Sequence, residues 1–468
     1  MKTRSKRIIL INPCQRPLYE SVKIKEGAIY SPVLSLAVLG ATCLKDGHQV
    51  KIFDMNLPQN NEKKLLVLLK KFHPDYAGIT FTTPLFPEMV RIAGLIKEEF
   101  PHCLLLGGGP HASSFPEETL QDSPLDLVVI GEGDFTLPEI LSGKRWENIA
   151  GICFKRQNQT KKTRRRDFIG DLDSLPLPAW QLYNLSQYQT SALLTRANPA
   201  GWIETSRGCI YGCVYCNKSV FGRTFRVKSA QRVADEITYM LKAGFKEIHI
   251  ADDNFTSDIK RAEVICDRIL ERELRFPWAT VTGIRVDKVS LKLLRKMRKA
   301  GCYRVYFGIE SGSQRVLDSI KKGINLEQVR QAVKWAKKAG LETFGFFMIA
   351  LPGEKVSDIK KTIKFATSLG LDIAKMSVTI PLPATPLYDE LERQGRIKAK
   401  DWSEFNLYVP VSTVYNHPTL DWETVDRYFS LFYRQFYFNP RYLIRRFVCA
   451  IKNRTLLTDI KTALKTKW

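Results

Sequence analysis

Short apolar runs alternate with helix-like stretches through the first 150 residues of the chain. The apolar runs lie at 7–12, 50–56, 75–81, 103–109 and 126–132, with helical spacing of apolar residues at 34–47 and 88–100. Strand–helix alternation is typical of a parallel sheet with helices on both faces, so it predicts an α/β fold. We expect residues 1–150 to form a doubly wound parallel sheet of the Rossmann-like kind.

A second strand–helix series occupies residues 196–400, after a basic hairpin-like segment and a Pro-containing linker at 151–195. Its six strand-like runs begin near residues 202, 247, 278, 303, 344 and 375. Helix-like stretches separate them near 230–243, 258–274, 290–299, 326–339 and 356–369. This pattern predicts a partial (β/α)6 barrel with its functional groups at the carboxyl ends of the strands. Residues 401–468 are rich in aromatic residues and predict a helical C-terminal extension.

The length and composition of the chain indicate a globular protein of two or three domains. It has 468 residues, of which 44% are hydrophobic and 26% charged. No apolar run approaches the ~20 residues that span a bilayer. The apolar stretch behind the basic N-terminus is too short for a signal peptide, so we interpret it as the first strand. Ten scattered Cys do not form a disulfide pattern, so we expect the reducing cytoplasm.

The formal net charge of +24 is unevenly distributed. Basic residues gather at 155–166 and again at 441–468, where eight Lys and Arg accompany a single acid. Leu443, Phe447 and Ile451 lie at helical steps of four in the second segment. Such a basic amphipathic helix can contact the inner face of an anionic membrane peripherally. The alternative is a helix over the barrel mouth with its charges in water, and nucleic acid is not an expected partner.

The most informative motif is SRGCIYGCVYCNKS, where Cys209, Cys213 and Cys216 have the spacing CxxxCxxC. Three thiolates at these steps can surround an iron–sulfur cluster, but four thiolates ordinarily hold four irons. The missing ligand leaves one iron open, as catalytic rather than structural metal sites do. The alternative is three unrelated core cysteines, although three of the ten Cys fall within eight residues here.

This motif, with Tyr215 directly before the third Cys, resembles the signature of the radical S-adenosylmethionine (radical SAM) superfamily. Further segments that resemble the superfamily follow in barrel order at 247–256, 282–289, 305–317 and 344–354. Upstream, GGGPHASSFPEE and VVIGEGD resemble the cobalamin-binding domain of one branch, which includes anaerobic magnesium-protoporphyrin ester cyclases and methyltransferases. The resemblance covers roughly residues 7 to 400.

The resemblance implies three cofactors: a 4Fe-4S cluster, S-adenosylmethionine and cobalamin. It implies that Cys209, Cys213 and Cys216 are the metal ligands and that the open iron binds S-adenosylmethionine. One-electron cleavage would then generate a 5′-deoxyadenosyl radical, which removes hydrogen from an unactivated carbon before methylation or cyclisation. The protein's task in such chemistry is to position the cofactors and exclude side reactions.

Further groups at the strand ends would bind S-adenosylmethionine by the same resemblance. Asp252 and Asp253 would contact the methionine ammonium, and Arg285 could pair with the carboxylate through its fork of donors. The alternative for Asp252 is an N-cap of the helix near 258. The alternative for Arg285 is an ion pair with Asp287.

Three more candidates complete the expected S-adenosylmethionine site. Glu310 could accept hydrogen bonds from the ribose hydroxyls, with a capping role as its alternative. Gly353 lies in a turn whose backbone would shape the adenine pocket, and a plain turn is its alternative. Tyr215 counts as cofactor-binding because it adjoins the third Cys.

Glycine-rich loops at one predicted edge of the first sheet are the candidate cobalamin site, because ligands bind beyond the carboxyl ends of such strands. The candidate cofactor-binding residues are Thr82, Thr83, Gly108, Gly109, Glu132 and Gly133. Many cobalamin proteins carry an Asp-x-His-x-x-Gly motif, which neither His48 nor His111 matches. The resemblance therefore implies a cobalamin whose lower face lacks a His ligand.

Two other functions remain open from the sequence. A transfer RNA methylthiotransferase would hold a second cluster on three N-domain cysteines, for which Cys14, Cys43 and Cys103 are the candidates. A corrinoid- or redox-sensing module would have the cofactors without an enzymatic activity. For the enzyme we expect a small-molecule, lipid or tetrapyrrole substrate and a reductant such as flavodoxin or ferredoxin.

Overall fold

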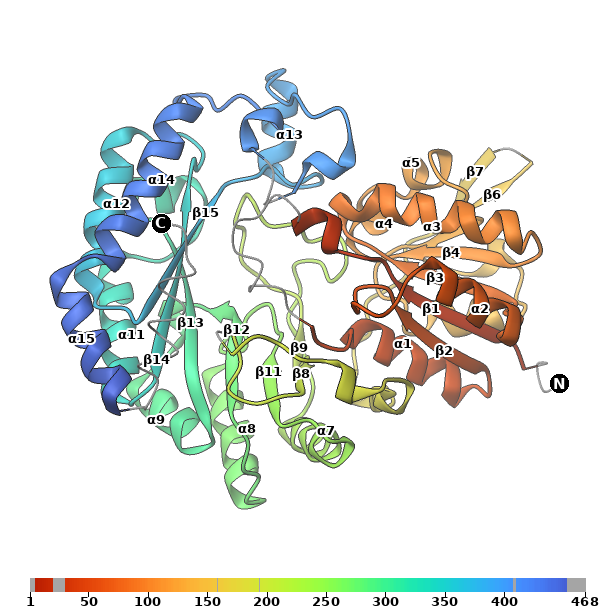
Figure 1. The fold of residues 1–468 in the computed structure, drawn as a ribbon, viewed down its shortest axis with the longest axis horizontal. Coiled ribbons are helices and arrows are strands. Elements are labelled where there is room, and N and C mark those ends of the chain that lie inside the picture. Colours follow the sequence, from red (N-terminus) through yellow and green to blue (C-terminus); the bar gives the residue numbers. More distant parts are fainter. Residues whose placement is uncertain (1–4, 20–29, 158, 193, 407–409, 453–468) are drawn as a thin grey trace.

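Two large sheets, each with its own helices, make up most of the described structure (Figure 1). The computed structural model describes residues 5–19, 30–157, 159–192, 194–406 and 410–452, with the backbone alone at Tyr19 and at 448–452. The first sheet and its helices run from red to yellow in Figure 1, and the second sheet and its helices from green to blue. Within the described ranges, no helix is long and apolar enough to cross a membrane.

The first sheet has the predicted doubly wound core. Its strand order is β2-β1-β3-β4-β5-β6-β7, and neighbours from β2 to β5 are parallel. The parallel strands are β1 (Arg7–Asn12), β2 (Gln49–Asp54), β3 (Tyr76–Thr80), β4 (Leu104–Gly108) and β5 (Leu127–Val129). The predicted basic hairpin forms as β6 (Ile152–Arg156) and β7 (Gln159–Lys162) and extends this sheet in antiparallel fashion.

Helices cover both faces of the first sheet, as its uninterrupted apolar strands require. One apolar core lies under α1 (Leu34–Lys45) and α6 (Thr136–Leu141). The other core lies under α2 (Glu62–Phe72), α3 (Phe86–Glu99), α4 (Pro110–Ser114) and α5 (Pro116–Gln121). The carboxyl ends of the strands are thereby left for ligands.

The second sheet is the predicted partial barrel, with six strands in the order β8-β11-β12-β13-β14-β15 and every neighbouring pair parallel. The strands are β8 (Ala200–Ile203), β11 (Glu247–Ile250), β12 (Trp278–Ile284), β13 (Cys302–Glu310), β14 (Glu342–Ile349) and β15 (Ile373–Val378). The helices that pack outside them are α7 (Ala230–Ala243), α8 (Ile259–Glu271), α9 (Leu291–Lys299), α10 (Gln314–Ser319), α11 (Leu326–Lys338) and α12 (Val356–Leu369). Along β14 burial alternates from residue to residue, because alternate side chains face the helices and the barrel interior.

Helix α13 (Pro386–Arg393) follows β15. The C-terminal extension, as predicted, contains helices in its described part, α14 (Trp422–Tyr437) and α15 (Pro440–Lys452). Helix α14 covers the edge strand β15. The Tyr437 hydroxyl donates to the Ala374 carbonyl at 2.9 Å and accepts from its N–H at 3.2 Å, and Tyr433 does the same at Met376. An exposed edge strand is prone to pair with other chains, and these hydroxyls occupy its free backbone groups.

Candidate active site

Cys209, Cys213 and Cys216 lie on one loop, residues 208–225, which we name the cysteine loop. It joins the short strands β9 (Ser206–Arg207) and β10 (Arg226–Val227), which pair antiparallel and close its base. Gly208 begins the loop with φ +83°, and a Cβ there would lie 2.2 Å from the Thr224 carbonyl oxygen. A glycine is therefore needed where the loop leaves the strand.

The donor set of the cysteine loop fits an iron–sulfur cluster. Cys209 and Cys213 are half-buried, and Cys216 is accessible to solvent although protein surrounds it. Desolvation raises the pKa of Cys216 to about 11, Lys218 lowers it, and the neighbouring Cys213 and Cys209 raise it further. In the described residues, no three His, Cys, Asp or Glu side chains converge as they would around one metal ion. Three separated thiols, without His or carboxylate, suit a cluster of several irons.

Contacts with the barrel hold the cysteine loop in place. The Arg285 guanidinium lies 3.5 Å from the centre of the Tyr211 ring, which is part of the loop. Arg285 also donates to Asp287 at 2.9 Å and to the carbonyls of Lys322 and Gly323 at 2.7 and 3.0 Å. The ion pair with Asp287 thus forms, and Arg285 ties the loop to the turn after α10. Its expected contact with the methionine carboxylate stays a prediction.

The two adjacent carboxylates at the end of β11 lie in different surroundings. Asp252 is 1% exposed and accepts hydrogen bonds from the Thr205 N–H, the Thr205 hydroxyl and the Ser206 hydroxyl. It anchors the segment that enters the cysteine loop, and Asp258 rather than Asp252 caps α8. Asp253 is exposed and accepts from the Gly208 N–H beside Lys218. Of the pair, only Asp253 is open to a ligand.

Glu310 ends β13 and forms a buried ion pair that the sequence did not indicate. Its carboxylate accepts from the Lys322 ammonium at 2.7 Å, and both side chains are 9% exposed. A Cβ on Gly308 would lie within 2.9 Å of both groups, so glycine leaves the space for this pair. Burial raises the pKa of Tyr215, and the negative charge of Glu310 raises it further. Tyr215 and Glu310, both predicted site residues, therefore lie together at the barrel mouth.

Gly353 lies in the turn that follows β14, as predicted. Its φ is +67°, and its carbonyl accepts from Arg315 at 2.8 Å. The next residue, Glu354, is fully buried, and burial raises its pKa to about 8. One of its carboxylate oxygens accepts from the Leu351 N–H at 3.2 Å, while the other has no hydrogen bond.

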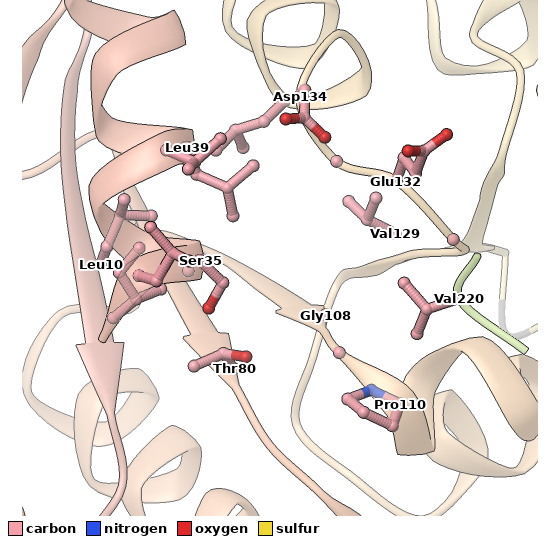
Figure 2. Close-up of a pocket in the computed structure, with 18 of the residues that line it drawn as sticks. Leu10, Ser35, Leu39, Thr80, Gly108, Pro110, Val129, Glu132, Asp134 and Val220 are labelled. Atoms are coloured by element: carbon pink, nitrogen blue, oxygen red, sulfur yellow. The ribbon is translucent and has the colours of Figure 1, made fainter. Parts of the chain in front are cut away.

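A cavity of about 390 Å³ opens at the carboxyl edge of the first sheet (Figure 2). Apolar side chains of β1, β4, β5 and the first turns of α1 form most of its wall. Of the predicted cobalamin residues, Gly108, Gly109, Glu132 and Gly133 line the cavity. A Cβ on Gly108 would meet nothing within 4 Å, so this glycine faces open space. The mainly apolar lining suits an apolar or aromatic part of a large ligand.

The cysteine loop itself forms the opposite wall of this cavity. Val220 and Phe221 line it from that side, and Figure 2 shows Val220 beside Gly108 and Pro110. A Cβ on Gly131 would lie 3.5 Å from the Val220 carbonyl oxygen, which shows how closely the two walls approach. The loop that carries the cysteines and the glycine-rich edge of the first sheet therefore enclose one space.

A buried network of charges joins the two walls. Arg207, directly before the cysteine loop, pairs with Glu132, Asp134 and Glu204 at 2.8, 3.0 and 2.6 Å. Arg226, directly after the loop, donates to both oxygens of Glu132 at 2.8 and 2.9 Å. Glu132 thus holds both ends of the loop. Sequence reasoning found Glu132 but not its two arginines, because ion pairs across domains leave no local pattern.

Thr82 and Thr83 follow β3 but do not line the cavity. The Thr83 hydroxyl lies 3.2 Å from Nδ1 of His111. His111 is fully buried among aromatic rings, and burial lowers its pKa to about 4. It packs inside the domain and does not line the cavity.

The cysteines required for a second cluster do not come together. Cys43 is buried in the core under α1, and Cys103 is buried in the core on the opposite face of the sheet. Cys14 is half-buried and packs against the second of these cores. The two-cluster methylthiotransferase is therefore not favoured.

The fold and this site define a two-domain α/β protein with a cysteine loop at a barrel mouth and a glycine-rich sheet edge beside it. Two family models match the chain: the radical SAM superfamily over residues 203–366 and the B12 binding domain over residues 27–141. The chain belongs to the cobalamin-binding branch of the radical SAM superfamily. Its cofactors are a 4Fe-4S cluster, S-adenosylmethionine and cobalamin.

Relatives and solved structures agree with this family. An uncharacterized methyltransferase, PH0819, from Pyrococcus horikoshii is 33% identical over 446 residues, which cover 94% of each chain. The cytidylyl-2-hydroxyethylphosphonate methyltransferase of Streptomyces wedmorensis is 29% identical over 79% of each chain. The anaerobic magnesium-protoporphyrin IX monomethyl ester cyclase of Cereibacter sphaeroides is 27% identical over 75% of this chain and 58% of its own.

Two solved structures share the fold across both domains. The methyltransferase TsrM from Kitasatospora setae, solved with tryptophan substrate and a SAM analogue, has a TM-score of 0.71 at 16% identity, covering 92% of this chain and 89% of that one. The cobalamin-dependent radical enzyme OxsB, with aqua-cobalamin and S-adenosylmethionine bound, has a TM-score of 0.68 at 21% identity. It covers 92% of this chain and 61% of that one.

Proposed function

We propose that this chain is a cobalamin-dependent radical SAM methyltransferase that methylates an unactivated carbon of a small molecule. The observation that carries the proposal is the single space enclosed by the cysteine loop and the glycine-rich sheet edge. A methyl donor and a radical generator must act on the same substrate, and these two walls bring their sites together. The names of the two relatives most similar above, both methyltransferases, support methylation over cyclisation.

Each domain expected from the sequence would have its own task. Residues 1–150 would bind cobalamin, residues 196–400 would generate the radical, and 151–195 and 401–468 would join and brace them. When bound, the cluster and S-adenosylmethionine supply a 5′-deoxyadenosyl radical and cobalamin supplies the methyl group. The protein's own residues hold these groups in position and exclude water from the radical.

At the barrel mouth, Cys209, Cys213 and Cys216 would hold three irons and leave the fourth to S-adenosylmethionine. Asp253 is the accessible carboxylate for the methionine ammonium, and Asp252 would position the loop that carries the cysteines. Glu310, oriented by Lys322 beside Tyr215, is placed for the ribose hydroxyls, and the turn at Gly353 for the adenine. Arg285 would keep the cysteine loop against the barrel.

At the sheet edge, the cavity between Gly108, Gly109, Gly133 and the cysteine loop fits the aromatic benzimidazole that ends the nucleotide tail of cobalamin. Glu132 would fix the wall between this tail and the cluster. Thr82 and Thr83, on the neighbouring loop, would face the rest of the cofactor. The partners that complete this function are a small-molecule substrate and a one-electron reductant such as flavodoxin or ferredoxin, both in the cytoplasm.

The test uses Gly108→Leu, which inserts a side chain into the cavity, and Gly94→Leu on α3, where a Cβ also meets nothing within 4 Å. Both proteins are purified without oxygen and reconstituted with iron and sulfide. Gly108→Leu should bind hydroxocobalamin at least tenfold more weakly by absorbance, while Gly94→Leu and the 4Fe-4S absorbance of both stay unchanged. Equal cobalamin binding by both variants would refute the cavity assignment.

The radical half of the proposal is tested separately with Cys213→Ala. This variant should lose the cluster absorbance and the release of 5′-deoxyadenosine from S-adenosylmethionine under strong reductant. Iron analysis of the unmodified protein should give about four irons per chain, the content of one cluster. Unchanged 5′-deoxyadenosine from Cys213→Ala, or about eight irons without corrinoid, would contradict the proposed function.

A further inference from the structure

The last described helix, α15, attaches to the barrel through its polar side. The Tyr442 hydroxyl donates to the Asp372 carbonyl at 3.2 Å, and the Arg445 guanidinium donates to the Leu371 carbonyl. The Tyr442 ring also packs 5.2 Å from the ring centres of Phe436 and Tyr437 of α14. Leu371 and Asp372 precede β15, so α15 lies at the end of the barrel opposite the mouth, and the alternative of a helix over the mouth is wrong.

The apolar side of α15 faces outward. Leu443, Ile444 and Phe447 are 49%, 68% and 55% exposed, respectively. Phe447 lies four residues after Leu443 and three after Ile444, and both spacings place side chains on the same face of a helix, so these three side chains form a single apolar ridge. A surface helix of a globular protein normally turns such a face to its core. The ridge on α15 therefore requires an occupant from outside the described structure.

The charge around the ridge indicates what that occupant is. Arg441 is exposed beside it, and Arg446 is half-buried on the other flank. From residue 441 to 468 the sequence has eight Lys and Arg and one acid, and the whole chain has a net charge of +24. An apolar ridge within a basic segment matches a membrane surface with anionic headgroups. The side chains of Ile451 and Lys452, expected on the same helix, lie outside the described part.

A second copy of the chain fits the ridge less well. A two-fold interface would place the same basic flanks against each other, and like charges would repel. Stable interfaces use about 20–30 residues on each side, whereas the ridge offers three apolar side chains. A bilayer does not need such an extended complementary surface, because its headgroups and acyl chains adapt to the helix.

We propose that α15 docks the protein peripherally on an anionic lipid bilayer, through the ridge formed by Leu443, Ile444 and Phe447 and the arginines beside it. The docked helix would hold the closed end of the barrel toward the membrane and leave the barrel mouth, with its cysteine loop, facing away. This orientation follows from the attachment of α15 at Leu371 and Asp372. It does not depend on the reaction that the barrel catalyses.

The experiment is flotation of the full chain with vesicles of phosphatidylcholine and phosphatidylglycerol, and with vesicles of phosphatidylcholine alone. The test variant is Ile444→Glu/Phe447→Glu. The matched control is Val67→Glu, because Val67 is 67% exposed on α2, away from the ridge. We expect the unmodified chain and the control to float with anionic vesicles and the double variant to bind at least tenfold less. Raising the salt concentration should weaken the binding.

Three outcomes would overturn the proposal. They are no flotation of the unmodified chain, equal flotation of the double variant and the control, or equal binding to neutral and anionic vesicles. Sedimentation velocity without lipid tests the other occupant: a dimer that the double variant converts to monomer would assign the ridge to a second copy. Thermal unfolding of all variants should coincide, since the replaced side chains are exposed, so lost flotation cannot come from misfolding.

Discussion

The Glu132 network should contribute several kcal/mol to stability, and Glu132→Gln tests this. The Glu132 side chain is 2% exposed, and Arg226, 10% exposed, has no other carboxylate partner in the described part of the chain. The amide of Gln keeps the shape but removes the charge, which leaves the buried Arg226 cation unpaired. Breaking a buried pair in this way costs about 3–5 kcal/mol. Because the amide oxygen still accepts one hydrogen bond, we expect a value near the lower end, about 3 kcal/mol.

The assay is thermal unfolding without oxygen, followed by intrinsic fluorescence. For a domain of 150–250 residues, about 1 kcal/mol lowers the melting temperature by about 2–4 °C, so Glu132→Gln should lower it by about 6–12 °C. The control is Glu271→Gln, since Glu271 is 56% exposed and pairs with Arg268 at the surface. Surface pairs contribute about 0–1 kcal/mol, so the control should stay within about 3 °C of the unmodified chain.

A double variant makes the reasoning falsifiable. Glu132→Gln/Arg226→Met removes the unpaired cation as well, so it should recover part of the stability lost in Glu132→Gln alone. The network also holds the cysteine loop against the cobalamin cavity, so Glu132→Gln should weaken hydroxocobalamin binding. Two results would refute this reasoning about Glu132. One is a melting temperature of Glu132→Gln within about 3 °C of that of the unmodified chain, and the other is strictly additive effects of the two substitutions.

Three further predictions concern groups outside this network. Tyr433→Phe removes both hydrogen bonds to Met376 of the edge strand, so it should lower the free energy of unfolding, measured with denaturant, by about 1–2 kcal/mol. The control is Tyr428→Phe, which should lower it less, because the Tyr428 hydroxyl has no hydrogen bond among the described residues. Burial raises the pKa of Glu354 to about 8, so the folded state binds more protons than the unfolded one above its ordinary pKa of 4.5. Stability should therefore fall as pH rises from about 4.5 to about 8, and Glu354→Gln should remove this fall; an unchanged slope between pH 5.5 and 8 would contradict it. Burial lowers the pKa of His111 to about 4, so its contribution should be present above pH 6.5 and lost as pH falls toward 4. In His111→Phe, the free energy of unfolding should therefore fall less between pH 7 and pH 5 than in the unmodified chain. An equally steep fall in both proteins would show that another group causes the loss of stability.

The order of elements and the class of fold were predictable because they depend on local pattern. Apolar runs of strand length between amphipathic helices predicted both parallel sheets and the helices α1, α3, α7, α8, α9, α11 and α12, but not α2, α4, α5, α6 or α10. The basic hairpin was predicted as well, although its pairing with β5, which extends the first sheet, was not. The cysteine spacing is also local, so one short motif was enough to predict the three cluster ligands.

Several side chains at the site have contacts that no local pattern contains. Asp252 and Arg285 have the residue types expected for ligand contacts, yet protein donors and acceptors occupy them in the fold. Lys322 lies in a basic turn without a recognisable motif, and only its ion pair with Glu310 in the structure shows that it belongs to the site. Which polar group is open to a ligand depends on partners that are distant in sequence.

By itself, the sequence determined the two sheets and the family and predicted the cluster ligands, because periodicity and motif spacing are properties of neighbouring residues. The tertiary structure alone decided that the cysteine loop forms a wall of the cavity at the edge of the first sheet and that α15 turns its apolar face outward. The same apolar pattern on α15 fits a helix facing in or facing out. Its direction is set by two hydrogen bonds, from Tyr442 and Arg445 to the two residues before β15, about 70 residues earlier in the chain.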